Sequence, residues 1–274
     1  MERLTPSKMC RVIAIVGKGG VGKSALTAMM VKILSRENEL KILAIDADPA
    51  MGLADALGVE VQGTIAHVSD KMQRDHRLRK KTENFHIKDV IWDVIQREQG
   101  FYFLGMGHDE GPGCFCGVNS LLKYGISSVS KDVDVIFVDC EAGIEQMKRR
   151  VLDRIDFLMG ITDVSARGFR VANLLKRIAY DGDQKTKPCD MGLVINKVNH
   201  EAVDIRQLSS KSNIRIMGCV PEDENISRYD LTGRPLRQLP DNSPALIATE
   251  KILREIINKQ KEDQDESITA ENAG

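Results

Sequence analysis

A short glycine-rich stretch constrains the fold of this chain more than any other feature. Residues 17–24 read Gly-Lys-Gly-Gly-Val-Gly-Lys-Ser and lie between an apolar run at 12–16 and an apolar helical pattern at 25–34. A strand, a glycine loop and a helix in this order can surround a phosphate with backbone N–H groups. Glycine lacks a Cβ, and the helix directs the positive end of its dipole at the anion. The sequence therefore predicts a nucleoside triphosphate site within an α/β domain.

Two side chains of this loop have expected roles of their own. Lys23 is placed to reach the β- and γ-phosphates, and the Ser24 hydroxyl is placed to ligate Mg²⁺. The residues expected to contact the nucleotide are Gly19, Gly20, Val21, Gly22, Lys23, Ser24 and Ala25. A glycine-rich turn without a ligand is the alternative, and the flanking strand and helix argue against it.

Strand-like runs recur along the chain with helical stretches between them. They cover residues 12–16, 41–46, 101–104, 134–139, 157–162, 191–196 and 214–220. Most are near-continuous runs of Val, Ile and Leu, which are typical of parallel strands buried on both faces. The pattern predicts one doubly wound α/β sheet of seven to eight mostly parallel strands, with ligand at their carboxyl ends. We expect an N-terminal extension at 1–9, one domain at 10–259 and a disordered acidic tail at 260–274.

The composition of the 274 residues argues against several classes of protein. A hydrophobic content of 42% and a charged content of 29% are ordinary for a soluble globular protein. A net charge of −1 lacks the basic footprint of nucleic-acid binding, and no apolar run approaches the roughly 20 residues that span a bilayer. Six cysteines without a secretory signal indicate a reducing cytoplasm. We therefore expect a cytoplasmic protein with neither nucleic acid nor membrane as a partner.

Carboxylates follow two of the predicted strands. Asp46 and Asp48 come at the end of the second run, and Asp139 ends the fourth. The carboxyl ends of parallel strands meet at one edge, so these side chains are expected where Mg²⁺ and an attacking water must be held. Asp139 is expected to hold Mg²⁺, and Gly143 to let a switch segment approach the γ-phosphate. For Asp48 and Pro49 a plain turn is the alternative.

Two cysteines separated by one residue, Cys114 and Cys116, lie in a loop with Gly and Pro. In extended backbone, residues i and i+2 project to the same side, so both sulfurs can face one ion. One chain then offers two soft ligands, whereas tetrahedral and square-planar ions take four. Two copies about a two-fold axis would supply four thiolates. Idle or buried thiols, or a local disulfide, are the alternatives.

The base is indicated by residues 196–199, which read Asn-Lys-Val-Asn. The N-K-x-D motif of GTPases uses its aspartate to accept two hydrogen bonds from guanine. Asn199 stands at that position and has no carboxylate. The sequence therefore favours ATP over GTP.

The loop resembles the deviant P-loop of the MinD/ParA/nitrogenase-iron-protein group of ATPases, because Lys18 follows its first glycine. The resemblance implies that Lys18 crosses a dimer interface to act on the partner's phosphates, where the transition state spreads negative charge. It also implies that Asp48 orients the attacking water and that Asp46 supports the Mg²⁺ shell. Asn196 and Pro221 are the adenine contacts that it implies.

A narrower resemblance rests on Lys18 together with residues 46–49, 114–116 and 139–145. In these the chain is similar to the CooC/AcsF ATPases, which assist nickel insertion into carbon monoxide dehydrogenase or acetyl-CoA synthase. The resemblance implies a homodimeric ATPase that binds Ni²⁺ or Zn²⁺ through Cys114 and Cys116, with a nickel enzyme as its client. An iron–sulfur carrier and a positioning ATPase of the MinD or ParA kind are the alternatives. Whether Cys140 joins a metal cluster stays open.

Overall fold

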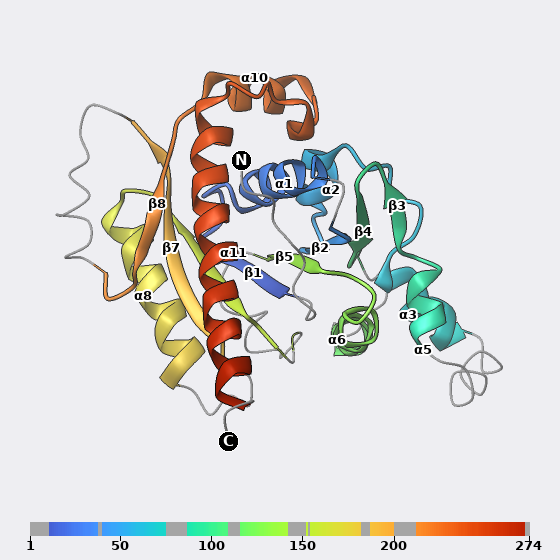
Figure 1. The fold of residues 1–274 in the computed structure, drawn as a ribbon. Helices are drawn as coiled ribbons and strands as arrows, with labels where there is room; N and C mark the ends of the chain where they lie inside the picture. The colour runs from blue at the N-terminus through green and yellow to red at the C-terminus, as the bar shows by residue number, and fades with distance from the viewer. Residues whose placement is uncertain are drawn as a thin grey trace.

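The computed structural model describes residues 11–37, 40–74, 87–108, 116–141, 152, 154–181, 187–199 and 212–271. In these ranges the chain forms an eight-stranded sheet with the strand order β3-β4-β2-β5-β1-β6-β7-β8 (Figure 1). The strands are β1 (Arg11–Gly17), β2 (Ile42–Ala47), β3 (Gln96–Glu98), β4 (Phe101–Gly105), β5 (Val135–Cys140), β6 (Phe157–Thr162), β7 (Asp190–Val198) and β8 (Ile216–Pro221). All neighbouring strands pair in parallel except β3, which pairs antiparallel with β4.

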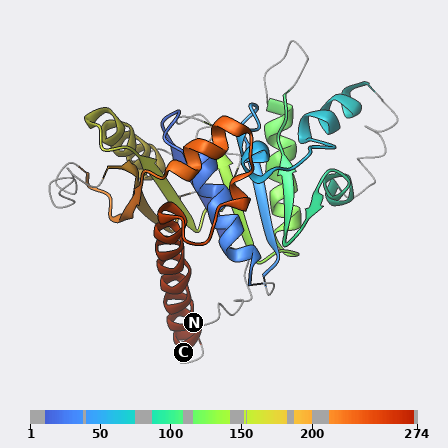
Figure 2. The ribbon, with the colours of Figure 1, turned by 90° about the horizontal axis from the view of Figure 1, so that it is seen from above.

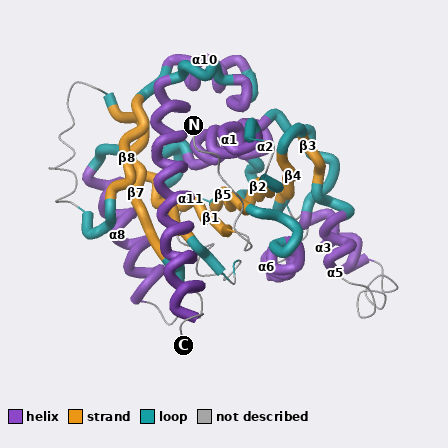
Figure 3. The backbone as a smooth tube through the Cα atoms, viewed as in Figure 1, coloured by secondary structure: helices purple, strands orange, loops and turns teal. Residues whose placement is uncertain are grey.

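Helices cover both faces of the sheet, as the purple helices on either side of the orange strands show in Figure 3. One face packs against α1 (Lys23–Ser35), α2 (Gly52–Leu57), α10 (Glu224–Thr232), the short 3-10 helix η1 (Leu236–Gln238) and α11 (Pro244–Glu271). The other face packs against α3 (Ile65–Arg74), α5 (Ile87–Trp92), α6 (Cys116–Val129) and α8 (Ala166–Asp181). Ile13 and Ile15 enter the first core while Val12, Ala14 and Val16 enter the second, because successive side chains of a strand project to opposite faces.

The predicted doubly wound α/β fold is confirmed. Strand β1 lies at the centre, between β5 and β6. One half of the sheet runs outward from β1 through β5, β2, β4 and β3, and the other half runs outward through β6, β7 and β8, so the direction of winding reverses at β1. Ligands of such sheets bind at the carboxyl ends beside this reversal. The glycine loop that follows β1 therefore lies at the centre of the candidate site.

Strand β3 was not predicted. Its three residues, Gln-Arg-Glu, contain no apolar side chain, and they form the edge of the sheet in a hairpin with β4. An edge strand with charged side chains resists pairing with other chains, so its sequence lacks the apolar run by which the other strands are recognised.

The C-terminal tail also differs from expectation. Residues 260–271, predicted to be disordered, continue α11 as a helix that ends at Glu271. Figure 2 shows α11 as one long helix leading to the C-terminus. Lys, Gln and Glu are good helix formers, and a helix already nucleated on the core extends at little cost. None of the helices in the described ranges has the length and apolar character needed to cross a membrane. The expected extension at 1–9 lies outside the described residues.

Candidate functional site

The glycine loop leaves the end of β1 and enters α1 within five residues, 18–22. Gly20 and Gly22 take left-handed backbone conformations, with φ of 76° and 90°, which glycine adopts without strain. Lys23, Ser24 and Ala25 then form the start of α1, whose first turn carries no acidic residue. The positive end of the helix dipole is thus left for an anion at the loop.

Two acidic side chains lie side by side at the carboxyl ends of β2 and β5. Asp46 pairs in register with Asp139, and both are almost fully buried, at 0% and 1% exposure. Because β1 pairs with β5 through Ile15 and Asp139, Asp139 lies on the strand next to the one that carries the loop, and Asp46 lies one strand further out, on β2. The strand register thus brings Asp46 and Asp139 together at one edge of the sheet.

Asp46 holds the turn that carries Asp48. One of its oxygens accepts hydrogen bonds from the N–H groups of Leu53 (2.8 Å) and Ala54 (3.2 Å), in the first turn of α2. Its other oxygen accepts a 3.2 Å bond from the N–H of Asp48. Asp48 in turn accepts a 2.9 Å bond from the N–H of Ala50. Asp46 therefore fixes the backbone around Asp48.

The Asp139 carboxylate has chemistry that suits a divalent cation. Its Oδ1 is buried and has no hydrogen-bond partner among the described residues. Burial raises the pKa of Asp139 to about 6, although a hydrogen bond with Ser24 and the charge of Lys23 both oppose the shift. An orphaned acceptor beside the Ser24 hydroxyl fits a Mg²⁺ shell, because Mg²⁺ takes oxygen ligands. Burial, and next the charge of Asp139, raise the pKa of Asp46 to about 7.

Lys18 lies on the exposed side of the loop, beside β6. Its Nζ is 3.9 Å from Oδ2 of Asp163, the residue that follows the last residue of β6. Both side chains are about one-third exposed, at 37% and 30%. A hydrogen bond from the Ser165 side chain, and also the charge of Lys18, hold the pKa of Asp163 below its usual value. Within one chain, Lys18 is therefore paired with a carboxylate at the surface and remains accessible.

The two predicted adenine contacts lie on neighbouring strands. Asn196 belongs to the end of β7, and its Nδ2 donates a 2.8 Å hydrogen bond to the carbonyl oxygen of Val21 in the loop. Pro221 is the last residue of β8 and pairs with Val198. Both residues are on the β6–β8 side of the loop. Their contact with a base stays a prediction.

The cysteine pair is only partly described. Cys116 begins α6, which places it at the positive end of a helix dipole, whereas Cys114 lies outside the described residues. Gly143 of the expected switch also lies outside them. No group of three or more His, Cys, Asp or Glu side chains suited to a metal ion occurs in the described part of the chain. The metal role of the pair stays a prediction.

Cys140 is a core thiol. It is 4% exposed, packs with the apolar residues under α6 and α8, and donates a 3.7 Å hydrogen bond to the carbonyl oxygen of Val138. Burial raises its pKa to about 12. In this structure Cys140 is therefore part of the apolar core beneath α6 and α8.

Comparison with known proteins decides the family. The model of the CobQ/CobB/MinD/ParA nucleotide binding domain matches residues 12–236, which include the whole glycine loop and all of the described strands apart from Arg11, the first residue of β1. The chain belongs to this family. As a member of it, the protein is an ATP-binding P-loop ATPase, as the sequence predicted.

Individual relatives span almost the whole chain. An uncharacterized ATP-binding protein of Methanocaldococcus jannaschii is 35% identical over 254 residues, covering 91% of this chain and 99% of that protein. The carbon monoxide dehydrogenase accessory protein CooC of Rhodospirillum rubrum is 27% identical, over 86% of this chain and 94% of that protein. The cell division ATPase MinD of Pyrococcus furiosus has the same fold, with a TM-score of 0.70 at 22% identity, over 91% of this chain and 99% of that one.

The sequence reasoning did not single out Asp163 and Lys197, whose side chains contact the loop in the structure. Asp163 follows an apolar strand in the same way as Asp139 does, so the rule that carboxylates at strand ends converge would have found it. Lys197 was read only as part of a base-recognition motif. In the structure its Nζ donates a 3.0 Å hydrogen bond to the carbonyl oxygen of Gly20, a contact that no local sequence signal announces.

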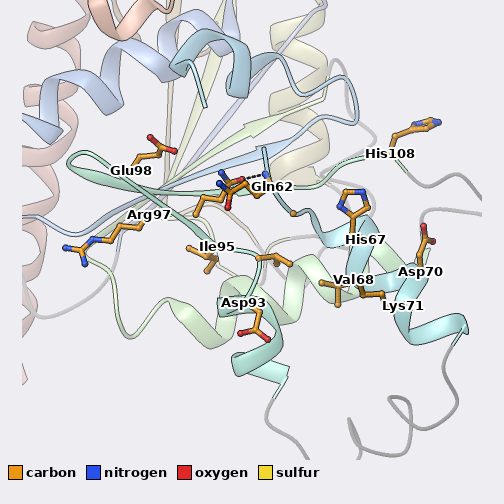
Figure 4. Close-up of a pocket in the computed structure, with 13 residues that line it drawn as sticks. Gln62, His67, Val68, Asp70, Lys71, Asp93, Ile95, Arg97, Glu98 and His108 are labelled. Carbon is orange, nitrogen blue, oxygen red and sulfur yellow. Dashed lines mark hydrogen bonds between the residues drawn. The ribbon is translucent and has the colours of Figure 1, made fainter. Parts of the chain in front are cut away.

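A hollow of about 750 Å³ lies away from the glycine loop, among α3, β3 and the residues after β4 (Figure 4). Its lining is mostly polar and includes His67, Asp93 and Arg97. His108 contributes to its rim just before the segment that contains the cysteine pair, and both histidines are exposed.

Proposed function

We propose that the protein is a homodimeric ATPase that carries Ni²⁺ or Zn²⁺ between the Cys114–Cys116 pairs of two chains. ATP binding and hydrolysis rearrange the interface and release the metal to a nickel enzyme, either carbon monoxide dehydrogenase or acetyl-CoA synthase. The observation that carries the proposal is the presence of the trans-acting loop lysine and the Cys-x-Cys pair in one chain of this family. Similarity to CooC of Rhodospirillum rubrum over 94% of its length supports this choice of client.

The nucleotide half of the proposal assigns roles to the residues around the loop. Lys23 binds the β- and γ-phosphates, while Ser24 and Asp139 hold Mg²⁺. Asp48, on the turn braced by Asp46, orients the attacking water. Mg²⁺ supplies charge neutralisation of the phosphates. Buried placement of Lys23 and Asp139 supports these roles, because charges act more strongly where water is excluded.

In the proposal, the nucleotide site and the metal site are coupled because both are formed at the interface between two chains. The Lys18 side chain is about one-third exposed and lies on the loop at the surface, so it can reach a second chain placed against this face. Two cysteines per chain provide half of a tetrahedral or square-planar set. Both sites are therefore complete only in the dimer, and a change at the phosphates alters the same interface that holds the metal.

Metal titration tests the proposal. We expect one Ni²⁺ or Zn²⁺ per two chains, and we expect the Cys114→Ser/Cys116→Ser double variant to lose this binding. Cys189→Ser is the matched control, because Cys189 is an exposed free thiol elsewhere in the fold. Retention of stoichiometric binding by the double variant would exclude the pair as the metal site.

Purification without oxygen distinguishes the proposed nickel carrier from the main alternative, an iron–sulfur ATPase. If the interfacial thiolates hold an iron–sulfur cluster, protein purified without oxygen is brown and shows cluster absorption. A colourless sample after an attempt at cluster reconstitution, with Ni²⁺ bound at half-stoichiometry, supports the nickel carrier. A reconstituted cluster that depends on Cys114 and Cys116 would instead favour an iron–sulfur ATPase.

A further inference from the structure

We propose that Lys197 is a positioning residue for ATP, and that it acts with Asn196 to hold the glycine loop in its binding shape. The inference rests on nucleotide binding at this loop and on no part of the nickel assignment. Lys197 donates from Nζ to the carbonyl oxygen of Gly20 at 3.0 Å, and Asn196 donates from Nδ2 to that of Val21 at 2.8 Å. Two consecutive residues of β7 thus donate hydrogen bonds to two consecutive carbonyl groups of the loop.

The backbone at this point of β7 is irregular in a way that serves the contact. The pairing of β7 with β8 shifts register between Ile195 and Val198, the signature of a bulge or irregularity. Lys197, inside the shift, has φ of 57°, a left-handed conformation that is uncommon for a residue other than glycine. Bulges redirect side chains beside functional sites, and left-handed residues persist where surrounding contacts over-determine them. Here the redirected side chains are those that reach the loop.

Holding the carbonyl groups also fixes the N–H groups of the loop. In a planar trans peptide the C=O and N–H bonds point in opposite directions. Lys197 holds the carbonyl oxygen of Gly20 and so directs the N–H of Val21 away from β7. Asn196 does the same for the N–H of Gly22 through the carbonyl oxygen of Val21. Both donors are therefore oriented before an anion arrives, which lowers the cost of binding it.

The close approach of β7 explains why Gly22 is required. A Cβ at this position would lie 2.4 Å from Nδ2 of Asn196, and the residue also has a positive φ of 90°. The loop and the end of β7 are thus fitted to each other at Gly20, Val21 and Gly22.

The test compares three variants of Lys197 for ATP affinity, measured by calorimetric titration, and for steady-state ATPase kinetics. Lys197→Met and Lys197→Gly both remove the ammonium group, but only glycine relieves the left-handed backbone. We expect both to bind ATP about fivefold to tenfold more weakly, the size of one lost charge-assisted hydrogen bond at an exposed site. KM for ATP should rise by a similar factor with kcat within about twofold, because the loop holds ground state and transition state alike. Lys197→Arg should recover most of the affinity.

Lys176→Met is the matched control, because Lys176 also donates to a backbone carbonyl oxygen, that of Asn213, far along the chain from the loop. It should bind ATP as the unsubstituted protein does. The proposal is overturned if Lys197→Met binds ATP normally, or if Lys197→Gly does so while Lys197→Met does not, since the backbone alone would then matter. If the unsubstituted protein itself bound no ATP, both the ATPase assignment and this proposal would fail. Absence of nickel binding would contradict the proposed function and leave this result intact.

Discussion

The Lys18 side chain pairs with Asp163 among the described residues and, in the proposed dimer, has a second partner in the other chain. Within the chain its ammonium group lies 3.9 Å from the Asp163 carboxylate, in a pair that is about one-third exposed. Such pairs contribute little to stability, because water and salt screen them. Lys18 can therefore leave Asp163 at low cost and move to the phosphates of a second chain. In the proposed dimer, Asp163 would hold the Lys18 side chain near the interface until then.

Replacing Lys18 by glutamine separates binding from turnover. We expect Lys18→Gln to bind ATP nearly as well as the unsubstituted protein and to lose turnover by about 100-fold or more, because the charge acts on the transition state. Steady-state ATPase assays and ATP titration measure the two effects. Lys131→Gln, on the exposed turn after α6, is the control and should leave both unchanged. Normal turnover in Lys18→Gln would show that this lysine does not act on phosphate.

The buried pair Asp46 and Asp139 makes the metal-free protein sensitive to pH. Burial first, and then the charge of Asp139, raise the pKa of Asp46 to about 7, and burial raises that of Asp139 to about 6. An unfolded aspartate titrates near about 3.9. The folded state therefore binds protons more tightly, and this contribution to stability, complete below about pH 4, is lost as the pH rises to about 7.

We accordingly expect a lower thermal midpoint at pH 8 than at pH 6 when the protein is in EDTA without nucleotide. Asp46→Asn removes one of the two charges and should flatten this dependence. Addition of Mg²⁺ and ATP should flatten it too, because the cation stabilises the charged form of Asp139. A midpoint that rises from pH 6 to pH 8 in the metal-free parent protein would contradict this account of the pair.

Among the elements, α11 packs on the core through residues up to Ile257 and continues as a helix to Glu271. The side chains of Ile252, Leu253, Ile256 and Ile257 are buried, and Arg11 donates a 2.8 Å hydrogen bond from Nη1 to the carbonyl oxygen of Ile257. These contacts tie the helix to the start of β1. The described packing of α11 on the sheet thus reaches Ile257.

Truncation tests this division of α11. Removal of residues 260–274 should leave the thermal midpoint and ATP binding nearly unchanged. Removal of everything after Lys251 deletes the four buried aliphatic residues, each contributing about 1.5–3 kcal/mol, which together approach the whole stability of a typical domain. We expect that shorter protein to be unfolded by circular dichroism. A large loss of stability in the longer truncation would show that residues after 259 also support the fold.

The elements that the sequence predicted are those with strong local signals. The run β1, glycine loop and α1 was predictable because a strand, three glycines and a helical pattern occur together, and Asp46 and Asp139 followed because parallel strands end at one edge. Strand β3 was not predictable, since its three residues are polar and gain their structure from β4. The hydrogen bond from Lys197 to the loop depends on an irregularity in the pairing of β7. This irregularity arises from tertiary packing, so it leaves no periodic pattern in the sequence.

For the whole molecule, the account depends on two chains that complete each other's sites. The P-loop fold and membership of the CobQ/CobB/MinD/ParA family give the chain its nucleotide site. The dimer would give it an active site with a trans-acting lysine and a four-thiolate metal site. ATP hydrolysis and metal binding, as proposed, therefore both require a dimer.

The most direct measurement is the mass of the protein in solution, by light scattering after gel filtration, combined with metal analysis of the same fractions. With a non-hydrolysable ATP analogue, Mg²⁺ and Ni²⁺ all present, we predict a species of twice the 30.5 kDa chain mass that contains one Ni²⁺ per two chains. Without nucleotide and nickel the dimer should be less populated. A single 30.5 kDa chain under every one of these conditions would contradict the account.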